Sequence, residues 1–464
     1  MKFLLPTGIS LNTLKIRWHV NADCARAFAF AVLIVGICHS ATASALYVNP
    51  PAASNAFPTF TTITAAVINA DAGDTIYVAP GVYYEDVIIG KQLSLVGAGS
   101  GRSIINALNK PNGIYIDGLD NPGLNRVVVT GFTIKNANFE GILVTNASLV
   151  TIFQNEVIDN DKALIPPETC PGQPAFETAE GFDCGEGIHF SGVDHSTVAD
   201  NIVKNNSGGI LLSDDTGATH DNLIRGNVVK NNPFDCGITL ASHPSASPTG
   251  GQPGVPLGVY HNTIAENESS DNGLAVEGAG AGVGIFDSVP GAQAFGNVVI
   301  NNRLKDNGLP GVAMHSHTPG QNLNDNVIVG NHISGNHADT EDAATPGPTG
   351  INVFSVSPVT GTIISGNVID DEAEDIVTNI TNTPAQVAAH INDLLGGQIG
   401  VDNHIGRGTV DATENWWGSP AGPGKQGATT AKGPISFTPW LTHPIEQDHE
   451  KGNQQDDRHN NAGR

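Results

Sequence analysis

The sequence predicts an all-β solenoid, a β-helix in which a short unit of strand and turn repeats along the chain. Two recurring phrases support this prediction. In one, asparagine precedes an aliphatic residue and a second asparagine follows, as in residues 201–206. In the other, glycine precedes a β-branched residue and an alternating run, as in residues 209–212. Self-similarity at a short period indicates a solenoid, and β-rich units with Asn and Gly at their corners indicate a β-helix.

The spacing of the phrases gives the size of one coil. Gly187 and Gly209 are 22 residues apart (209 − 187), so one coil is about 22 residues plus any loop it carries. Longer intervals contain insertions rich in Pro, Gly and acids, which we expect on one side of the solenoid, at 161–184, 241–258, 268–282 and 337–349. Asparagines stacked at equivalent corners can hydrogen-bond along the stack, so we assign them a structural role.

Both ends of the repeat region have features typical of caps. Residues 60–70 have apolar side chains at helical spacing, which predicts a short helix covering the first coil. Near the other end, Trp416, Trp417 and Trp440 predict an aromatic cap, with a sugar-stacking platform as the alternative. The polar tail at 445–464 is expected to be disordered. We therefore predict one domain over 46–444.

Residues 1–45 have the pattern of a secretory signal, with basic residues, an apolar run and a small-residue cleavage site. Without them, 17 basic and 45 acidic residues remain (21 − 4 and 46 − 1), a net charge of −28. Such a surface repels nucleic acid and anionic lipid, so we expect neither as a partner. No apolar run approaches the roughly 20 residues that a membrane span needs. We expect a secreted or periplasmic protein.

Three cysteines remain after that segment. Cys170 and Cys184 flank one insertion and are the natural disulfide pair in an oxidising compartment. Cys236 lies two coils beyond Cys184, about 9–10 Å at one strand spacing per coil, whereas a disulfide needs Cα atoms within roughly 7 Å. We therefore expect Cys236 to be a small buried side chain, and we regard its pairing as the less favoured alternative.

The segments YVNP at residue 47, DTIYVAPGVYYEDV at residue 74, LSLVGAG at residue 93 and NWWGSPAGP at residue 415, with the Asn repeats, resemble bacterial right-handed parallel β-helix repeat proteins of the pectin-lyase-like superfamily. The resemblance implies a right-handed cylinder with three parallel sheets. It also implies action on carbohydrate, because the superfamily holds polysaccharide lyases, glycoside hydrolases, esterases, epimerases and tailspikes. It includes accessory proteins without known catalysis as well, so fold alone does not choose among these.

Enzyme signatures from these relatives are incomplete in this chain. Asp214-Asp215 matches one element of the polygalacturonase-like hydrolases, but their Gly-His-Gly and Arg-Ile-Lys are absent. The Asp-Pro-His-Asp of the alginate epimerases is also absent. Copper-accessory β-helix proteins would suggest Met-rich or His-rich sites, whereas Met314 is the only methionine after residue 45.

Alternation along each strand predicts which polar side chains face outward. When the aliphatic residues after each glycine point inward, the residues between them point to solvent. Stacked coils then bring one set of polar side chains to, or close to, a single lateral face. The catalytic candidates on it are Glu186, His189, Asp214 and Asp215, and the substrate-binding candidates are His243, Asp287, His315 and His317.

Two of these groups have alternative interpretations. Asp214 and Asp215 would suit glycosidic cleavage, which needs carboxyl groups roughly 5–9.5 Å apart, provided that a turn or bulge reorients one of them. Otherwise their Ser-Asp-Asp-Thr-Gly setting is turn chemistry. His315 and His317 would suit a metal if a neighbouring coil supplied a third ligand, with Asp287 or His243 as the candidate. Otherwise they are solvated histidines.

The acids of the 161–184 insertion lack the regular spacing of a calcium loop, so we interpret them as a solvated loop. Ca²⁺ is the one cofactor that the sequence suggests, because it would let an acidic surface bind a polyanionic glycan. We predict a protein that binds a polysaccharide along one lateral face and cleaves it as a hydrolase or lyase. The alternative is a non-catalytic envelope or matrix protein that binds carbohydrate or has a structural role. The oligomeric state stays open.

Overall fold

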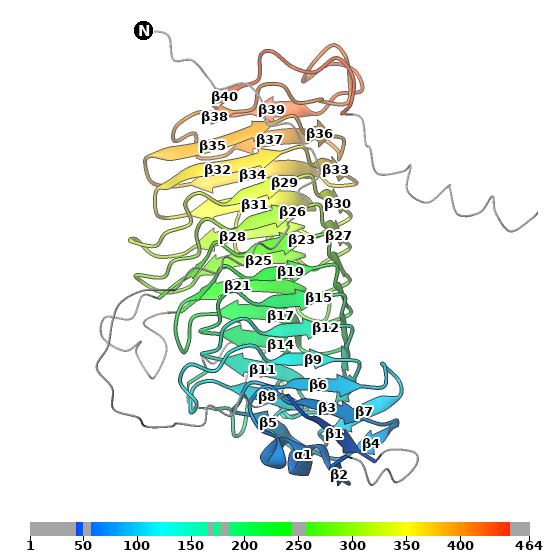
Figure 1. Cartoon of the computed structure of the whole chain (residues 1–464). Helices are drawn as coiled ribbons and strands as arrows, with labels where there is room; N and C mark the ends of the chain where they lie inside the picture. Colours follow the sequence, from blue (N-terminus) through cyan, green and yellow to red (C-terminus); the bar gives the residue numbers. More distant parts are fainter. Residues whose placement is uncertain are drawn as a thin grey trace, which may run out of the picture. The chain divides into compact units, whose positions relative to one another are not determined.

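The computed structural model describes residues 43–49, 57–165, 170–174, 176–177, 185–243 and 257–445. These residues form stacked coils of parallel strands, with one short helix at the N-terminal end of the stack (Figure 1). Within the described part, three long sheets hold 15, 11 and 12 strands and are called sheets A, B and C. The fold is the predicted right-handed parallel β-helix.

Each sheet takes one strand from each successive coil, so its strands pair in the following order. Sheet A contains β2 (Thr59–Phe60), β1 (Ala45–Val48), β3 (Thr75–Val78), β6 (Ser94–Gly97), β9 (Val128–Thr130), β12 (Thr151–Phe153), β15 (Thr197–Ala199), β19 (Leu223–Arg225), β23 (Thr263–Ala265), β26 (Val298–Ile300), β29 (Val327–Val329), β32 (Val359–Ser365), β35 (Ala385–His390), β38 (Val410–Asp411) and β40 (Ile435–Ser436). Sheet B contains β36 (Asp393–Leu394), β33 (Val368–Asp370), β30 (His332–Ser334), β27 (Arg303–Lys305), β24 (Glu268–Ser270), β20 (Val228–Lys230), β16 (Ile202–Lys204), β13 (Glu156–Ile158), β10 (Thr133–Lys135), β7 (Ser103–Asn106) and β4 (Gly81–Tyr83). Sheet C contains β39 (Thr430–Lys432), β37 (Ile399–Asn403), β34 (Glu374–Ile380), β31 (Thr349–Ser355), β28 (Val312–Ser316), β25 (Val283–Asp287), β21 (Ile238–Ser242), β17 (Gly208–Ser213), β14 (Glu186–Ser191), β11 (Ile142–Thr145), β8 (Ile114–Asp117) and β5 (Val87–Ile89). A small pair joins β18 (Thr219–His220) to β22 (Val259–Tyr260).

Sheet C differs from the other two sheets in its burial. A typical sheet B strand such as β20 buries only its middle residue, with partly exposed neighbours on either side. In β14 and β17, by contrast, every residue is buried. A parallel strand is buried on both faces only when something covers its outer side. The outer face of sheet C is therefore the covered face of the solenoid, and the candidate site lies there.

The predicted asparagine ladders are present, and there are three of them in the described part. In each, the side-chain oxygen of one asparagine accepts bonds from the backbone and side-chain nitrogens of the equivalent asparagine one coil earlier, as Asn227 does from Asn201 at 3.0 Å each. The longest ladder contains Asn155, Asn201, Asn227, Asn267, Asn302, Asn331, Asn367, Asn392 and Asn415. A second contains Asn222, Asn262, Asn297 and Asn326. The third contains Asn160, Asn206, Asn232, Asn272, Asn307 and Asn336, and ends on Glu372.

The repeated glycines have a steric explanation. Each lies just before a sheet C strand or at its start, and at Gly141 and Gly209 the chain passes close to the next coil and to an aliphatic side chain of sheet B. A Cβ atom on Gly209 would lie 2.1 Å from the carbonyl oxygen of Gly237 and 2.3 Å from the Val229 side chain. The equivalent atom on Gly141 would lie 2.2 Å from Val157. Glycine recurs here because no other residue fits.

Both predicted caps are present. The helix α1 (Ile63–Asn69) is shorter than the predicted 60–70, because Phe60 belongs to β2. Its first turn is held by Thr62, whose side chain accepts a bond from Ala65 N, and by the Glu85 carboxylate, which accepts bonds from Ile63 N and Thr64 N at 2.8 Å each. At the other end Trp417 is fully buried and packs against Phe437, which makes it a cap rather than a sugar platform.

Other predictions are refined or lie outside the described residues. The signal segment 1–45 lies almost wholly outside them, but Ala45 already pairs with Thr75 in the first coil. Residues 446–464 of the predicted tail also lie outside. The insertion predicted at 268–282 is shorter, since β24 occupies its first three residues. No helix in the part of the chain that the structure describes is long and apolar enough to cross a membrane.

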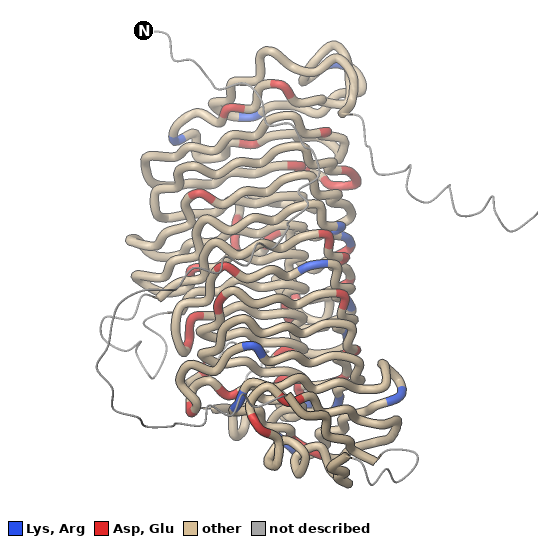
Figure 2. The backbone as a smooth tube through the Cα atoms, viewed as in Figure 1, with Lys and Arg blue, Asp and Glu red and all other residues tan. Residues whose placement is uncertain are grey.

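The charge distribution agrees with the composition. Acidic residues are spread along the whole stack of coils, whereas Lys and Arg are few (Figure 2). Cys170 is disulfide-bonded and Cys236 is a free, buried cysteine. Cys184 lies outside the described residues, so its pairing with Cys170 stays a prediction.

Candidate functional site

Acidic and histidine side chains meet on the outer face of sheet C, over β11, β14, β17 and β21. We call this group the acid–histidine cluster. The strand register pairs His189 with Leu211 and Ser191 with Ser213. The outward-facing side chains of β14 therefore lie next to the outward-facing side chains of β17. The cluster consists of Glu140, Glu177, Glu186, His189, Ser213, Asp215 and His243, and all seven side chains are buried.

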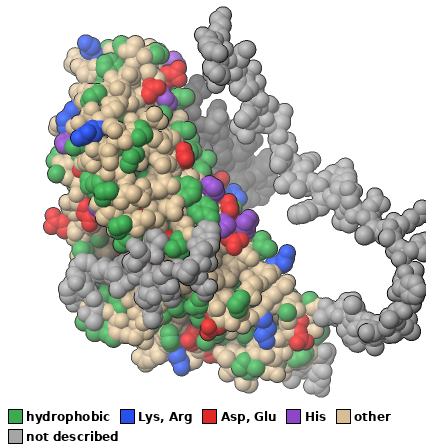
Figure 3. Space-filling model, turned by 90° about the vertical axis from the view of Figure 1, so that its left-hand side faces the viewer, with side chains coloured by type: hydrophobic (Ala, Val, Ile, Leu, Met, Phe, Trp, Pro, Cys, Tyr) green, Lys and Arg blue, Asp and Glu red, His purple; other side chains and the backbone are tan. Residues whose placement is uncertain are grey.

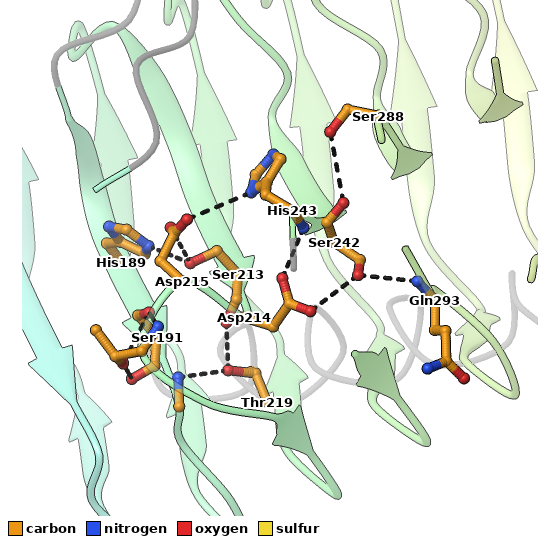
Figure 4. Close-up of polar contacts among 12 residues, drawn as sticks. His189, Ser191, Ser213, Asp214, Asp215, Thr219, Ser242, His243, Ser288 and Gln293 are labelled. Atoms are coloured by element: carbon orange, nitrogen blue, oxygen red, sulfur yellow. Dashed lines mark hydrogen bonds and ion pairs between the residues drawn. The ribbon is translucent and has the colours of Figure 1, made fainter. Parts of the chain in front are cut away.

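A hydrogen-bonded chain fixes the state of His189 (Figure 4). The Ser213 hydroxyl donates to Asp215 Oδ2 at 2.7 Å and lies 2.8 Å from His189 Nε2. Because that hydroxyl uses its proton on Asp215, it accepts the proton of Nε2 from His189. The Nδ1 atom then faces Glu140 Oε1 at 3.4 Å and Glu186 Oε2 at 3.9 Å. Asp215 also lies 3.6 Å from His243 Nδ1.

Two carboxyl groups converge with His189 on the other side of the ring. Single donor atoms of Glu140, Glu177 and His189 all lie within 4.8 Å of one another. Both carboxyl oxygens of Glu177, and Oε2 of Glu140, are buried without a hydrogen-bond partner within the described residues. Burial raises the pKa of Glu177 well above its ordinary value, and the carboxyl groups of Glu140 and Asp215 raise it further. The environment of Glu177 therefore favours the protonated form of its carboxyl group.

Four of the predicted site residues come together in this cluster, namely Glu186, His189, Asp215 and His243. Asp214 does not join them. It occupies an inward position at the end of β17, fully buried, where its carboxylate accepts bonds from Ser242 Oγ at 2.9 Å and His243 N at 2.7 Å (Figure 4). Both residues follow the end of β17, and they point to different sides: Asp214 toward Ser242 and Asp215 toward His243 Nδ1 (Figure 4).

Asp287 is likewise on the inner side rather than on the predicted face. Register places it next to Ser242 and Ser316 in the inward row, and it is fully buried. Its Oδ2 accepts a bond from Asn322 N at 3.0 Å. Burial raises the pKa of Asp287 to about 8 despite that bond, and the nearby Asp214 adds to the shift. Its position indicates a structural role in joining two coils.

Replacing Asp287 with asparagine is expected to change how stability depends on pH. The folded pKa of about 8 exceeds the unfolded value near 3.8, so unfolding releases a proton and the wild type loses stability as pH rises between those values. Asparagine still accepts the bond from Asn322 but has no proton to lose. As the pH rises from about 4 to about 8, the free energy of unfolding of Asp287→Asn should therefore increase by about 2–4 kcal/mol relative to that of wild type. Denaturant unfolding midpoints of both proteins, measured across this pH range, check the prediction. If the midpoints of variant and wild type change with pH in parallel, the prediction is wrong.

A second group lies farther along the same face and is called the histidine–glutamate cluster: His315, His317, Asp339 and Glu341. Glu341 Oε2 lies 3.5 Å from His315 Nδ1 and 3.2 Å from His317 Nε2. The third group near the two histidines is therefore Glu341, from the 337–349 insertion, and not the predicted Asp287 or His243. Burial opposes the charge on His315, but hydrogen bonds to Asp339 and Glu341 outweigh it and raise the pKa of His315 to about 9.

Histidine and acidic side chains also gather on the exposed surface (Figure 3). In the described part, His195, His220 and Asp221 have donor atoms within 4.8 Å of one another. The ring of His220 stacks on that of Tyr260 at 4.9 Å, and Tyr260 stacks on Phe295 at 5.1 Å. His220 and Tyr260 of this stripe belong to the small β18–β22 pair, and the sequence does not predict the stripe.

Sequence reasoning misses Glu140, Glu177, Ser213, Asp339 and Glu341. A signal is available for Glu140, because it precedes Gly141 as Glu186 precedes Gly187, and the two strands pair in that register. The interpretation of the 161–184 acids as a solvated loop is wrong for Glu177, which is buried against His189. Loop residues such as Glu177, Asp339 and Glu341 have no repeat position, so alternation assigns them no register.

Comparison with known proteins agrees with this fold. Residues 61–252 match the family model for a right-handed β-helix region, and residues 175–371 match the model described as periplasmic copper-binding protein (NosD). No curated protein matches the sequence.

Among solved structures, the Dettilon tailspike protein (gp208) aligns with a TM-score of 0.53 and 14% identity, covering 85% of this chain and 68% of its own. The mannuronan C-5 epimerase AlgE4 A-module of Azotobacter vinelandii has a TM-score of 0.45 and 14% identity, over 82% of this chain and 93% of its own. The polygalacturonase of Erwinia carotovora ssp. carotovora has a TM-score of 0.43 and 11% identity, over 87% and 96%. The chain is a right-handed β-helix.

Proposed function

We propose that this chain is an extracytoplasmic protein that binds a polysaccharide on the outer face of sheet C and cleaves it at the acid–histidine cluster. The convergence of Glu140, Glu177 and His189 carries the proposal, because two carboxyl groups and an imidazole lie side by side there and burial raises the pKa of Glu177. The signal-like segment 1–45 and the match to a periplasmic family support the location. The resemblance of the sequence to the pectin-lyase-like superfamily, many of whose members act on polysaccharides, supports the substrate class.

The proposed chemistry follows from the placement of the two carboxyl groups. Hydrolysis of a glycosidic bond needs one carboxylic acid to protonate the leaving oxygen and one carboxylate to act as base or nucleophile. Glu177, whose pKa burial raises, is the proposed acid. Glu140 is the proposed nucleophile, because donor atoms of the two carboxyl groups lie within 4.8 Å of each other, which is closer to the roughly 5–5.5 Å of retaining enzymes than to the roughly 6.5–9.5 Å that leave room for a water. The chain from Asp215 through Ser213 orients His189 beside both. These groups favour hydrolysis over elimination, in which a base must remove a carbon-bound proton.

A second candidate function is non-catalytic binding of carbohydrate. The observation that favours it is burial, since Glu140, Glu186 and His189 are 1%, 2% and 3% exposed. In that case the cluster stabilises the coils, and glycan binds elsewhere on the face. The half-buried stripe of His220, Tyr260 and Phe295 offers ring edges and the outer face of a terminal ring to a sugar.

The test is to incubate the protein from residue 43 onward with neutral and uronic-acid polysaccharides, with and without Ca²⁺. Reducing ends report hydrolysis, and the ultraviolet absorbance of unsaturated uronate reports elimination. We expect reducing ends alone. Glu177→Gln and Glu140→Gln should each reduce the rate at least about 10²-fold, the scale of general acid–base catalysis.

Glu266→Gln is the matched control, because Glu266 is half exposed and paired with Arg225 on sheet A, so its rate should equal wild type. Unsaturated products would show that the protein cleaves by elimination and not by hydrolysis. Full activity in Glu177→Gln would remove the acid–histidine cluster from the mechanism. Glycan binding without cleavage by any variant would establish the second candidate.

A further inference from the structure

We infer that His315, His317 and Glu341 form a binding site for a divalent transition ion of the Zn²⁺ or Cu²⁺ class. The site is separate from the acid–histidine cluster, and the inference does not depend on polysaccharide cleavage. It rests on the placement of three donor groups, on a buried carboxylate that orients one of them, and on an open side toward solvent.

The three donor groups converge although they come from different parts of the chain. His315 lies in β28 and His317 directly follows that strand, so the two imidazoles are on the same side. Glu341 reaches them from the 337–349 insertion. Its Oε2 lies 3.5 Å from His315 Nδ1 and 3.2 Å from His317 Nε2, and one donor atom of each of the three residues lies within 4.8 Å of the others. Two imidazole nitrogens and one carboxylate are the donor set of many open zinc sites.

Asp339 fixes the orientation of His315. Its Oδ2 is hydrogen-bonded to His315 Nε2. The carboxylate itself is held by Asn352 Nδ2 at 3.0 Å and by the backbone nitrogen of Glu341, which donates to Oδ1 at 3.1 Å. Asp339 is buried, and so is His315, whose other nitrogen is thereby directed at Glu341. A carboxylate behind a ligating histidine is the usual arrangement around protein-bound metals, because it orients the ring and makes it a stronger ligand.

The surroundings suit an ion that keeps an open position. The rings of Phe286 and Phe354 lie on either side of His315, with centroids 5.3 Å and 5.6 Å away, and they form an apolar wall. On the other side His317 is 38% exposed and Glu341 is 57% exposed, so an ion can reach the donors from solvent. Imidazole donors favour Zn²⁺ and Cu²⁺ over Ca²⁺ and Mg²⁺, which prefer oxygen.

The alternative is a network of imidazolium and carboxylate groups that needs no ion. Binding of Zn²⁺ to untagged, chelator-treated protein separates the two, measured by titration calorimetry and by metal content after dialysis. We expect one tight site per chain. His317→Ala and Glu341→Gln should each weaken the binding of Zn²⁺ at least about 10-fold, and Asp339→Asn should weaken it by about 10- to 100-fold by misorienting His315.

Two further variants act as controls. His332→Ala removes an exposed histidine of sheet B that pairs with Asp370, and should bind Zn²⁺ as wild type does. A His195→Ala/His220→Ala variant tests the stripe. Paramagnetic resonance of the Cu²⁺-loaded protein should show two coordinating imidazoles in wild type and one in His317→Ala.

Several results would overturn the inference. Absence of stoichiometric Zn²⁺ binding would establish the ion-free network. Binding that survives in His317→Ala and Glu341→Gln but is lost in the His195→Ala/His220→Ala variant would move the site to the stripe. Unchanged affinity in Asp339→Asn would remove the positioning role of that carboxylate.

Discussion

Replacing Gly209 with alanine is expected to lower the free energy of unfolding by about 3 kcal/mol or more. The added Cβ would lie 2.1 Å from the carbonyl oxygen of Gly237, in the next coil. That oxygen cannot move aside, because it accepts a hydrogen bond from Ile210 N at 2.9 Å. The side chain of Val229, 2.3 Å from the same Cβ, blocks the other direction. Denaturant unfolding of the purified variant measures the effect.

Gly81→Ala is the control for this experiment. Gly81 is also a strand glycine, in β4, but its Cβ would meet only the Tyr83 ring, at an ordinary 3.5 Å. The free energy of unfolding of Gly81→Ala should lie within about 1 kcal/mol of the wild-type value, and alanine should add a small stabilisation by restricting the unfolded chain. Equal stability of the Gly209 and Gly81 variants would show that the coils can separate enough to admit a methyl group.

Replacing Asn227 with alanine is expected to lower the free energy of unfolding by about 3–5 kcal/mol. Its side chain accepts bonds from Asn201 N and Nδ2 and donates to Val198 O and Asn267 Oδ1, each at 3.0 Å. Truncation leaves these buried groups without a partner, and water cannot reach them. Because desolvated groups are left behind, the cost exceeds that of one ordinary hydrogen bond.

Asn382→Ala provides the comparison, because Asn382 is exposed and bonds only to the nitrogen of the next residue. The free energy of unfolding of Asn382→Ala should differ from that of wild type by no more than about 0.5 kcal/mol. Thermal and denaturant unfolding of both variants measure the difference. A loss below about 1 kcal/mol for Asn227→Ala would mean that the ladder contributes little beyond what the backbone bonds provide.

The repeat makes the fold predictable because every coil uses the same residue types at the same turns and strands. Gly209 and Asn227 are required by contacts with equivalent positions one coil away, so the requirement occurs many times in the sequence. The outward direction of His189 and Asp215 follows from alternation with Ile188 and Ile210. The predicted outward position is wrong at two strand ends, because the side chains of Asp214 and Asp287 point inward and do not join the outer face.

The loops could not be placed from the sequence. Glu177 and Glu341 each complete a cluster, yet both lie in insertions whose path depends on tertiary contacts and not on the repeat. Composition suggests only that such acids are solvated, and Glu177 is buried instead. What places Glu341 beside His315 is the carboxylate of Asp339, two residues earlier, bonded to Asn352 of the next coil. That contact does not belong to the repeat, so no other coil signals it.

The direction of the bonds between coils also determines how the stack responds to force. In each sheet the strands run across the stack, and the hydrogen bonds that join them point along it. A pull on the two ends therefore loads the bonds at a terminal coil first, and that coil peels away before the next one is strained. The asparagine ladders also bond coil to coil, so an axial pull loads them together with the strand bonds. Unfolding under such a pull should therefore proceed one coil at a time, starting from an end.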